Sequence, residues 1–238
     1  MKKVWLIGAN SDVAKELMLQ MDGKYSIVAA SRNYCAVKDF IKKKKIRRAV
    51  AVELDVCNKD NLESFLFSMQ QPDIVIFSQG KLETGSNVGD YLDEMVQCNY
   101  VACIRIIEKV WKGMADKGKG CITGITSVAA DRGKMSNKLY SSTKAAFSCY
   151  LQALMQEGEK TGIQVIDIKP GYIRSKMLIS NRKAYKSVLA AEPSEAATSI
   201  LQKIESGRSG TVYTKKIWRL IMWGLKLMPE RIYNKMSL

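Results

Sequence analysis

Short apolar runs alternate with longer segments of helical period along almost the whole chain. The runs are rich in Val and Ile and apolar on both faces, which is typical of strands in a sheet that helices cover on both sides. We expect strands at Val4–Ile7, Ser26–Ala30, Ala49–Leu54, Ile74–Phe77, Cys121–Ile125, Val165–Ile168 and Thr211–Tyr213. We expect helices at Val13–Met21, Val37–Lys44, Asp60–Met69, Leu92–Met114, Ser142–Lys160 and Glu195–Ser206. Ser194 is the expected N-cap of the last helix.

Strict alternation of strand and helix predicts an α/β fold whose parallel strands are joined by right-handed crossovers. We therefore expect a single Rossmann-type domain, a doubly wound parallel sheet of about seven strands, over residues 1–213. A basic amphipathic tail, residues 214–238, follows it. In such sheets ligands bind at the carboxyl ends of the strands, so the loops that follow the strands should face one crevice.

The net charge of +15 suits an acidic partner, which can be a nucleic acid, an anionic membrane surface or a phosphorylated substrate. The run Lys42–Lys45, with Arg47 and Arg48 after it, is better interpreted as a solvated surface than as a specific phosphate or lipid contact. No basic stripe interleaved with aromatic residues indicates nucleic-acid binding.

Cysteine and histidine usage bears on metal binding and on the cell compartment. The six cysteines have no paired metal spacing and histidine is absent, so no metal site is expected. Every cysteine falls in or beside an apolar stretch, where a buried, reduced thiol is the ordinary interpretation. Together with the lack of a secretory signal segment, this favours a cytoplasmic protein.

A turn that could hold a pyrophosphate follows the first strand. It leads into a helix, whose free N–H groups and positive dipole end favour an anion. The candidate cofactor-binding residues in this turn are Gly8, Asn10, Ser11, Asp12 and Val13. The usual fingerprint has three glycines, whereas Asp12 and Ala14 stand at the later two places here. An ordinary capped turn would explain the segment about as well.

Three further strand ends carry candidate cofactor contacts. Arg32 follows the second strand, where an acid would bind a ribose 2′-hydroxyl and an arginine suits a 2′-phosphate. NADP(H) is therefore favoured over NAD(H), although a solvated loop arginine would leave the choice open. Asp55, followed by Val56, could meet the adenine amino group. Ser78 and Gly80 end the fourth strand, where a glycine lets the backbone approach a cofactor.

Ser127 ends the fifth strand, and Tyr140 and Lys144 follow it at helical spacing. On a helix the tyrosine and the lysine lie on one face, a turn apart. Tyrosine is a poor base at neutral pH because its ordinary pKa is about 10, and a nearby ammonium favours the phenolate. A serine at the strand end could polarise a substrate oxygen. Such a pair is common by chance, and it gains weight from the strand-end serine and the upstream nucleotide-type turn.

In its order of motifs the sequence resembles the short-chain dehydrogenase/reductase family over roughly residues 3–213. The motifs that carry the resemblance are Gly8 to Ala14, Asp55-Val56, Asn99, Ser127, Tyr140 with Lys144, and Pro170-Gly171. The resemblance implies an NAD(P)(H)-dependent oxidoreductase that reduces a carbonyl, or oxidises an alcohol, by hydride transfer. It also implies a homo-oligomer, because members are often dimers or tetramers.

The resemblance implies a role for each matching residue. Tyr140 would be the acid/base residue, and Lys144 would bind the nicotinamide ribose and favour the phenolate. Ser127 would orient the carbonyl or hydroxyl. Asn99 would hold a water of the proton relay through its backbone, the alternative being an interior polar residue that bends its helix. The loop that holds the carboxamide would contribute Pro170, Gly171, Ile173 and Ser175.

Some positions depart from the family pattern. Ser78-Gln79-Gly80 replaces the usual Asn-Ala-Gly, Ser175 stands where threonine is more usual, and the glycine turn is reduced. We expect altered cofactor packing without loss of binding. A nucleotide-sensing protein that keeps the fold and does no chemistry is the alternative function.

The tail contains a basic stretch with two tryptophans, residues 215–228. On a helix its charges Lys215, Arg219 and Lys226 share a narrow arc, and the apolar residues Ile217, Trp218, Leu220, Ile221, Leu225 and Met228 cover much of the rest. This stretch is too short and too charged to span a bilayer. It could lie in a membrane interface, or pack against the core or another subunit.

The tail and the turn spelled Gly-Ala-Asn-Ser-Asp-Val-Ala together resemble one branch of the family. That branch includes the reductase partner of decaprenylphosphoryl-ribose 2′-epimerase. The resemblance implies a keto-sugar on a polyprenyl phosphate, used in cell-surface polysaccharide synthesis, and a protein at the inner face of the membrane.

Overall fold

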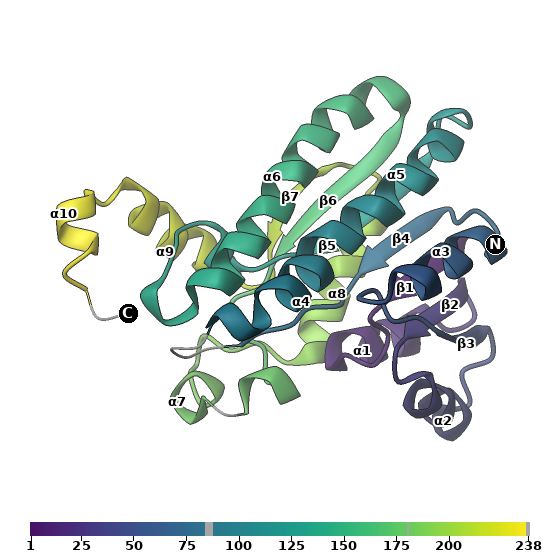
Figure 1. The fold of residues 1–238 in the computed structure, drawn as a ribbon, viewed down its shortest axis with the longest axis horizontal. Coiled ribbons are helices and arrows are strands. Elements are labelled where there is room, and N and C mark those ends of the chain that lie inside the picture. The colour runs from purple at the N-terminus through teal and green to yellow at the C-terminus, as the bar shows by residue number, and fades with distance from the viewer. Residues whose placement is uncertain (84–87, 180, 237–238) are drawn as a thin grey trace.

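The computed structural model describes residues 1–83, 88–179 and 181–236. Within these ranges, seven parallel strands form one sheet between two layers of helices (Figure 1). The strands are β1 (Lys3–Ile7), β2 (Ser26–Ser31), β3 (Ala49–Glu53), β4 (Ile74–Phe77), β5 (Gly120–Ile125), β6 (Ile163–Lys169) and β7 (Gly210–Tyr213). Their order across the sheet is β3-β2-β1-β4-β5-β6-β7, which confirms the predicted α/β doubly wound fold.

Successive strand residues point to opposite sides of the sheet, and in the central strands both sides are buried. Val4 and Leu6 belong to the core under one helix layer, whereas Trp5 and Ile7 belong to the core under the other. The first layer consists of α1 (Asp12–Met21), α2 (Tyr34–Lys44) and α8 (Pro193–Glu205). The second consists of α3 (Lys59–Ser68), α5 (Ala102–Ala115) and α6 (Lys138–Thr161). This two-sided burial explains why a central strand such as β4 is apolar throughout.

Shorter helices lie outside these layers. α4 (Leu92–Val96) passes through a π-helical turn, Gln97–Val101, into α5. α7 (Arg182–Tyr185) follows β6, and the tail forms α9 (Lys216–Leu227) and α10 (Glu230–Tyr233). In Figure 1 both tail helices project beyond the sheet at the end of the molecule opposite β3. The last two residues of the predicted tail, 237–238, lie outside the described residues.

The structure corrects three local predictions. The N-cap of α8 is Glu192 and not Ser194, because Pro193 begins the helix and Glu192 and Glu195 form a reciprocal capping box. The segment 92–114 is not one regular helix, since the π turn interrupts it. Cys35 and Cys149 are exposed on α2 and α6, although Cys103 and Cys121 are buried as expected.

Two findings bear on the charged and apolar surface. Lys42, Lys43 and Lys44 form the last turn of α2 and are exposed, where cations complement the helix dipole. This agrees with the interpretation of the run as a solvated surface. Within the ranges the structure describes, no helix is long and apolar enough to cross a membrane.

Candidate active site

The turn after β1 is fixed by close approach of three strand ends. Gly8 has φ of +82°, and a Cβ at this position would lie 2.6 Å from the Cα of Gln79, which follows β4. The backbone N–H groups of Gly8 and Ala9 donate to the carbonyl of Ala30 in β2, at 2.9 and 3.0 Å. The turn therefore requires glycine, and it lies where the strand order reverses between β1 and β4, the usual ligand position in such sheets.

Ser11 caps the helix that follows this turn. Its Oγ accepts from the N–H of Ala14 at 3.1 Å and lies 2.6 Å from the Oγ of Ser78. The side chain of Val13 is buried in the core, so only its backbone can meet a ligand. The side-chain oxygen of Asn10 is buried and meets no donor among the described residues. Ser11 therefore caps the helix, as the capped-turn interpretation predicts. The other free N–H groups of the first helical turn remain available to a ligand.

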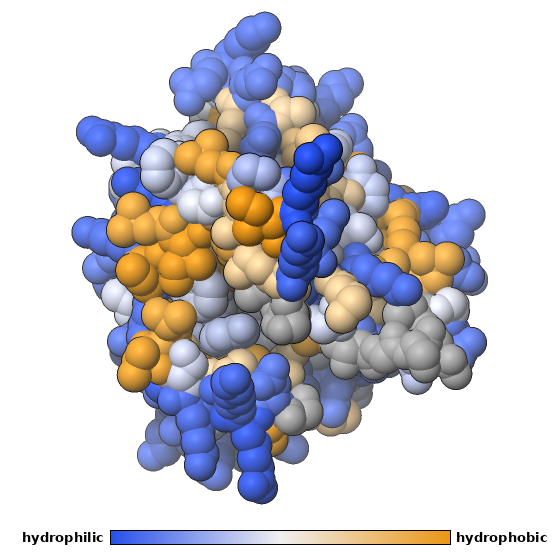
Figure 2. Space-filling view, turned by 90° about the vertical axis from the view of Figure 1, so that its left-hand side faces the viewer, coloured by the Kyte–Doolittle hydropathy of each residue, from blue (hydrophilic) through white to orange (hydrophobic). Residues whose placement is uncertain are grey.

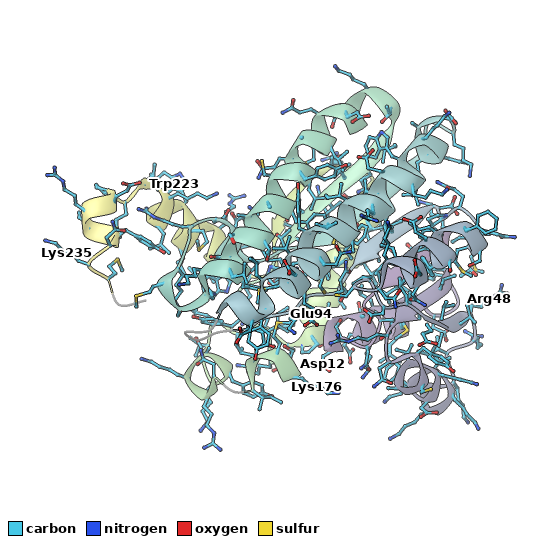
Figure 3. The ribbon with its side chains drawn as sticks, viewed as in Figure 1. Asp12, Arg48, Glu94, Lys176, Trp223 and Lys235 are labelled. Carbon is cyan, nitrogen blue, oxygen red and sulfur yellow. The ribbon has the colours of Figure 1, made fainter. Side chains whose placement is uncertain are left out.

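Asp12 links the turn to the segment after β6. Its carboxylate accepts from the backbone N–H of Lys176 at 2.8 Å, and Figure 3 shows the two labelled residues side by side at the start of α1. The segment after β6 is ordered by Arg174, which donates to Glu192 at 2.7 Å and to the carbonyl of Tyr185 at 3.1 Å. One hydrogen bond thus joins the turn that the sequence assigned to the pyrophosphate and the loop that it assigned to the carboxamide.

Arg32 lies at the end of β2 and faces α4. Its guanidinium is 3.5 Å from a carboxylate oxygen of Glu94, which also binds Lys81. The hydrogen bond from Lys81 lowers the pKa of Glu94. The Arg32 side chain is 69% exposed, so its guanidinium is open to a ligand that competes with this carboxylate.

The loop after β3 packs against the π turn. The carboxylate of Asp55 accepts from the N–H of Cys57 at 3.0 Å, which closes a local turn. Val56 is buried, and its carbonyl accepts from the side chain of Gln97 at 3.1 Å. The local turn therefore uses one carboxylate oxygen of Asp55, and the other oxygen takes no part in it.

Lys144 holds the ends of β4 and β5 together. Its side chain is buried, and its ammonium donates to the carbonyl of Ile125 at 2.9 Å and to that of Gln79 at 3.5 Å. A Cβ on Gly80 would lie 3.4 Å from this ammonium, in ordinary contact with it. Lys144 thus lies at the predicted strand ends and beside the segment that follows β4.

Ser127 and Tyr140 flank the same region. Ser127 caps the short turn Val128–Ala130, and its Oγ accepts from the N–H of Ala129 at 3.1 Å. Tyr140 is half-buried in the first turn of α6, one helical turn before Lys144. The structure therefore brings Ser127 and Lys144 to the end of β5, with Tyr140 on the Lys144 face of α6.

Asn99 is completely buried in the π turn. Its side-chain oxygen accepts from the N–H of Lys81 at 2.8 Å, and its amide donates to the carbonyl of Lys81 at 2.9 Å and to Thr143 at 3.1 Å. Asn99 therefore holds the segment after β4 against the helix that carries Lys144. This agrees with the second sequence interpretation, an interior polar residue where the helix is irregular, and the water-holding role stays a prediction.

The loop after β6 lies beside the Ser127 turn. The carbonyl of Pro170 accepts from the N–H of Val128 at 2.9 Å. Ile173 pairs with Ala191, and the N–H of Ser175 donates to the carbonyl of Ile173 at 2.7 Å. A Cβ on Gly171 would overlap the ring of Trp218 from α9. The predicted carboxamide loop is thus adjacent to the predicted catalytic serine.

A buried charge cluster beneath this region was not predicted. Asp131 accepts from Lys169, Lys226 and Tyr213, each at 2.7 Å. Burial by itself raises the pKa of Asp131, but the hydrogen bonds from these three groups outweigh it and the pKa is lowered. Asp167 accepts from Thr126 at 2.5 Å and from Ser148 at 2.6 Å. The available signal was the presence of two charged residues, Asp167 and Lys169, in and beside a strand predicted to be buried.

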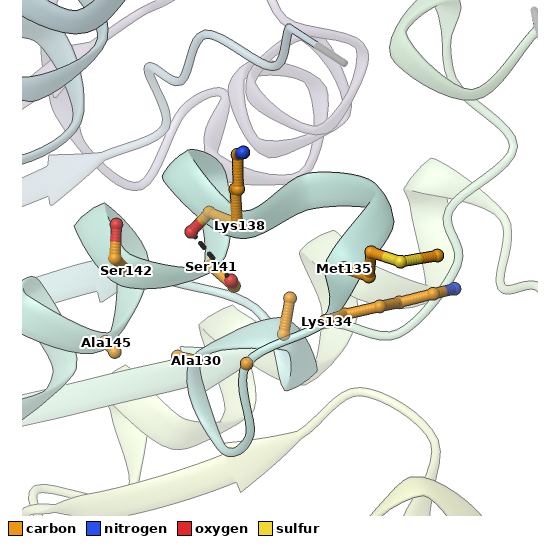
Figure 4. A pocket seen from close by; sticks show the side chains of 9 residues that line it. Ala130, Lys134, Met135, Lys138, Ser141, Ser142 and Ala145 are labelled. Carbon is orange, nitrogen blue, oxygen red and sulfur yellow. Dashed lines mark hydrogen bonds between the residues drawn. The ribbon is translucent and has the colours of Figure 1, made fainter. Parts of the chain in front are cut away.

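A separate apolar pocket of about 330 Å³ opens beside the N-terminus of α6. Figure 4 shows Lys134, Met135 and Lys138 at its edge, with Ala130 and Ala145 on its walls. Ser141 closes part of the wall by donating to the carbonyl of Lys138 at 3.0 Å. Tyr140 and Lys144 do not line this pocket, so it is distinct from the strand-end crevice.

Comparison with known proteins agrees with this geometry. Residues 2–186 match the model of the short chain dehydrogenase family. Acetoacetyl-CoA reductase of Allochromatium vinosum is 31% identical over 116 residues, which is 45% of this chain and 47% of that protein. The match therefore spans about half the length of this relative.

Two solved structures share the fold. A short-chain dehydrogenase of Sphingobium yanoikuyae in complex with NADPH has a TM-score of 0.82 and 16% identity, covering 100% of this chain and 97% of that one. A 3-oxoacyl-[acyl-carrier protein] reductase of Brucella melitensis with bound NAD has a TM-score of 0.75 and 18% identity, covering 90% of each chain. The family match over most of the length identifies the protein as a member of the short-chain dehydrogenase/reductase family, an oxidoreductase that acts on carbonyl or alcohol groups.

Proposed function

We propose that the protein is an NADP(H)-dependent carbonyl reductase whose catalytic centre is Ser127, Tyr140 and Lys144. The observation that carries the proposal is the position of the buried Lys144 ammonium, which is held by the carbonyl of Ile125 at the end of β5. This contact keeps the cation one helical turn from Tyr140 and close to the strand end that carries Ser127.

The three side chains divide the proton chemistry between them. Tyr140 donates a proton to the substrate oxygen, and the Lys144 ammonium stabilises the phenolate that remains. The hydroxyl of Ser127 donates a hydrogen bond to the same oxygen as negative charge develops on it. A bound nicotinamide cofactor supplies the hydride. Asn99 acts on this centre indirectly, by holding the chain after β4 against Thr143 of α6.

The residues around the crevice fit a dinucleotide. Gly8 lets the turn pack against Gln79, and the first-turn N–H groups of Asp12 and Val13, at the start of the next helix, are available to a pyrophosphate. The side-chain oxygen of Asn10 has no donor among the described residues, and it could accept a hydrogen bond from a ribose hydroxyl. Asp55 and Val56 would border the adenine, and Ser78 and Gly80 the central part. Pro170, Gly171, Ile173 and Ser175 would border the carboxamide.

The role of Tyr140 is tested by Tyr140→Phe. NADPH oxidation, screened with acetoacetyl-CoA and with other keto compounds, should fall by about 10²- to 10⁴-fold, because the general acid is lost. NADPH affinity, measured by cofactor fluorescence, should be unchanged. Tyr150→Phe is the matched control, since Tyr150 lies on the same helix and binds Glu108 away from the crevice. Equal turnover by wild type and Tyr140→Phe would refute the assignment.

Arg32 supports the preference for NADP(H), because its exposed guanidinium at the end of β2 can exchange its contact with Glu94 for a 2′-phosphate. Arg32→Ala should weaken NADPH binding by about tenfold, the loss of one charge-assisted contact, and leave NADH binding unchanged. Arg47→Ala, which removes an exposed arginine paired with Asp22, is the control. An equal loss of affinity for both cofactors would contradict the preference.

The finer part of the proposal concerns substrate and location. The branch resemblance supports a keto-sugar on a polyprenyl phosphate, processed at the inner face of the membrane by a homo-oligomer that touches the bilayer through residues 215–238. Lipid-linked keto-sugars therefore belong in the NADPH oxidation screen. Turnover of water-soluble ketones alone would remove this part and leave the catalytic centre intact.

A further inference from the structure

The inner face of α9 is bonded to the two segments that would form the walls of the proposed catalytic crevice. At its start, Trp218 packs edge-on against Tyr172 at 5.2 Å, covers Gly171 and donates to the carbonyl of Leu189 at 3.2 Å. At its end, the Lys226 ammonium binds Asp131 at 2.7 Å. The loop after β6 and the segment between Ser127 and Tyr140 are therefore joined by this one helix.

Arg132 fixes the end of α9 and the start of α10. Its guanidinium donates to the carbonyls of Leu225 and Met228, the latter at 2.8 Å, and lies 3.9 Å from the ring centroid of Tyr233. The hydroxyl of Tyr233 donates to the carbonyl of Gly133 at 2.6 Å. Both tail helices are thus held in one orientation relative to the crevice.

The outer face of α9 is apolar and exposed. Ile217, Leu220, Trp223 and Leu227 are 44%, 62%, 65% and 64% exposed, and their spacing places them in one stripe opposite the buried Trp218. We call these four residues the outer stripe. Ile232 in α10 and Met135 beside the Tyr233 contact add further exposed apolar surface, at 55% and 86%. Figure 2 shows apolar side chains gathered on this side of the molecule between long hydrophilic ones.

The surroundings of the stripe are strongly basic. Residues 214–236 contain six basic side chains and one acidic one, Glu230. Lys215 and Lys226 are bound inward by the carbonyl of Ala190 and by Asp131. The remaining four basic residues are exposed, and they are Lys216, Arg219, Arg231 and Lys235.

The combination of an exposed apolar stripe with basic surroundings favours one kind of partner over another. A second copy of the chain would bring the same positive surface to the stripe, on a protein whose net charge is already +15. An anionic lipid surface offers the opposite charge to the basic side chains and an apolar layer to the stripe, and an exposed tryptophan suits the boundary between the two. The charge pattern therefore favours a bilayer over self-association.

We infer that α9 and α10 dock on an anionic phospholipid bilayer, with the outer stripe inserted and Lys216, Arg219, Arg231 and Lys235 on the lipid phosphates. The inference rests on the membrane contact within the proposed function and does not require the catalytic assignment. Because the inner face of α9 is bonded to both walls, docking fixes the crevice beside the membrane surface, where a substrate with a lipid anchor would be presented.

The test is flotation of the full chain with vesicles of phosphatidylglycerol and phosphatidylcholine, compared with vesicles of phosphatidylcholine alone. Binding should be at least tenfold stronger to the anionic vesicles and should weaken with added salt. The double variant Leu220→Ser/Trp223→Ser should lose at least tenfold in affinity while its Tm is unchanged, because both side chains are exposed. Phe67→Ser is the matched control, since Phe67 is 91% exposed on α3, away from the tail.

The charge requirement is tested by Lys216→Gln/Arg219→Gln against Lys42→Gln/Lys43→Gln, which removes two equally exposed cations from α2. Only the first pair should reduce binding to anionic vesicles. No flotation of the wild type, or a stripe variant that floats like wild type, overturns the inference. A dimer that dissociates only in the stripe variant also overturns it, by identifying a second copy as the partner. Tyr140→Phe should bind vesicles normally, so failure of docking and failure of the catalytic proposal are separable.

Discussion

The two ends of the crevice are built by different means. At the end of β1 the chain relies on close backbone approach and neutral contacts, with Gly8 against Gln79 and Ser11 beside Ser78. At the ends of β5 and β6 it relies on buried charge, because Asp131 binds Lys169 and Lys226 beneath the Ser127 turn. Both ends join segments that are distant in the sequence, the first through backbone packing and hydroxyl groups and the second through buried ion pairs. Disturbing the two ends should therefore have different consequences.

The largest effect is expected at the charged end. Asp131→Asn leaves the buried Lys169 without its closest carboxylate, and breaking a buried ion pair costs about 3–5 kcal/mol. The free energy of unfolding from urea titration should fall by about this amount. Asp116→Asn, an exposed position at the end of α5, should change it by less than about 0.5 kcal/mol. Similar small losses in both variants would show that buried charge does not hold this end together.

The contribution of Asp131 should also depend on pH. Its pKa is lowered in the folded protein, where hydrogen bonds from Lys169, Lys226 and Tyr213 outweigh the effect of burial. A lowered pKa gives stability that is fully present above the unfolded value of about 3.9 and is lost as the pH falls through the folded value.

The difference in unfolding free energy between wild type and Asp131→Asn should therefore be constant from about pH 7 to about pH 5 and shrink below about pH 4. Urea titrations of both proteins across this range provide the measurement. A difference that grows on acidification would have the wrong sign for a carboxylate stabilised in its charged form.

The neutral end should show a smaller loss of stability together with a loss of cofactor binding. Gly8→Ala combines a positive φ with a collision against the backbone of Gln79, so it should cost about 1–3 kcal/mol and weaken NADPH binding. Gly118→Ala is the control, because Gly118 has φ of +59° with open space around it and reports the backbone strain alone. If Gly8→Ala and Gly118→Ala lost the same unfolding free energy, the close approach of Gly8 to Gln79 would contribute nothing to stability.

Features that depend on local sequence patterns could be predicted from the sequence. Runs of Val and Ile predicted the strands because burial on both faces leaves no alternation, and helical spacing predicted that Tyr140 and Lys144 share α6. The roles of these residues, and of the whole set of candidate contacts, stay predictions. Local patterns therefore predict the strands and the shared helix of Tyr140 and Lys144 well.

Long-range features could not be predicted in this way. The π turn around Asn99 is set by bonds to Lys81 and Thr143, and helix propensity does not distinguish it from a regular turn. Asp131 and Lys226 are separated in the sequence by β6, α8 and β7, so no local pattern indicates their contact. Ser194 was expected to cap α8, but the preceding Glu192 and Pro193 form a stronger start.

The position of Trp218 against Gly171 has a consequence for the order in which the protein is made. The loop after β6 and the segment from Ser127 to Tyr140 leave the ribosome before the helix that joins them. During synthesis both walls therefore exist for a time without their connection. The crevice takes its final form only after translation has passed Met228, whose carbonyl Arg132 binds.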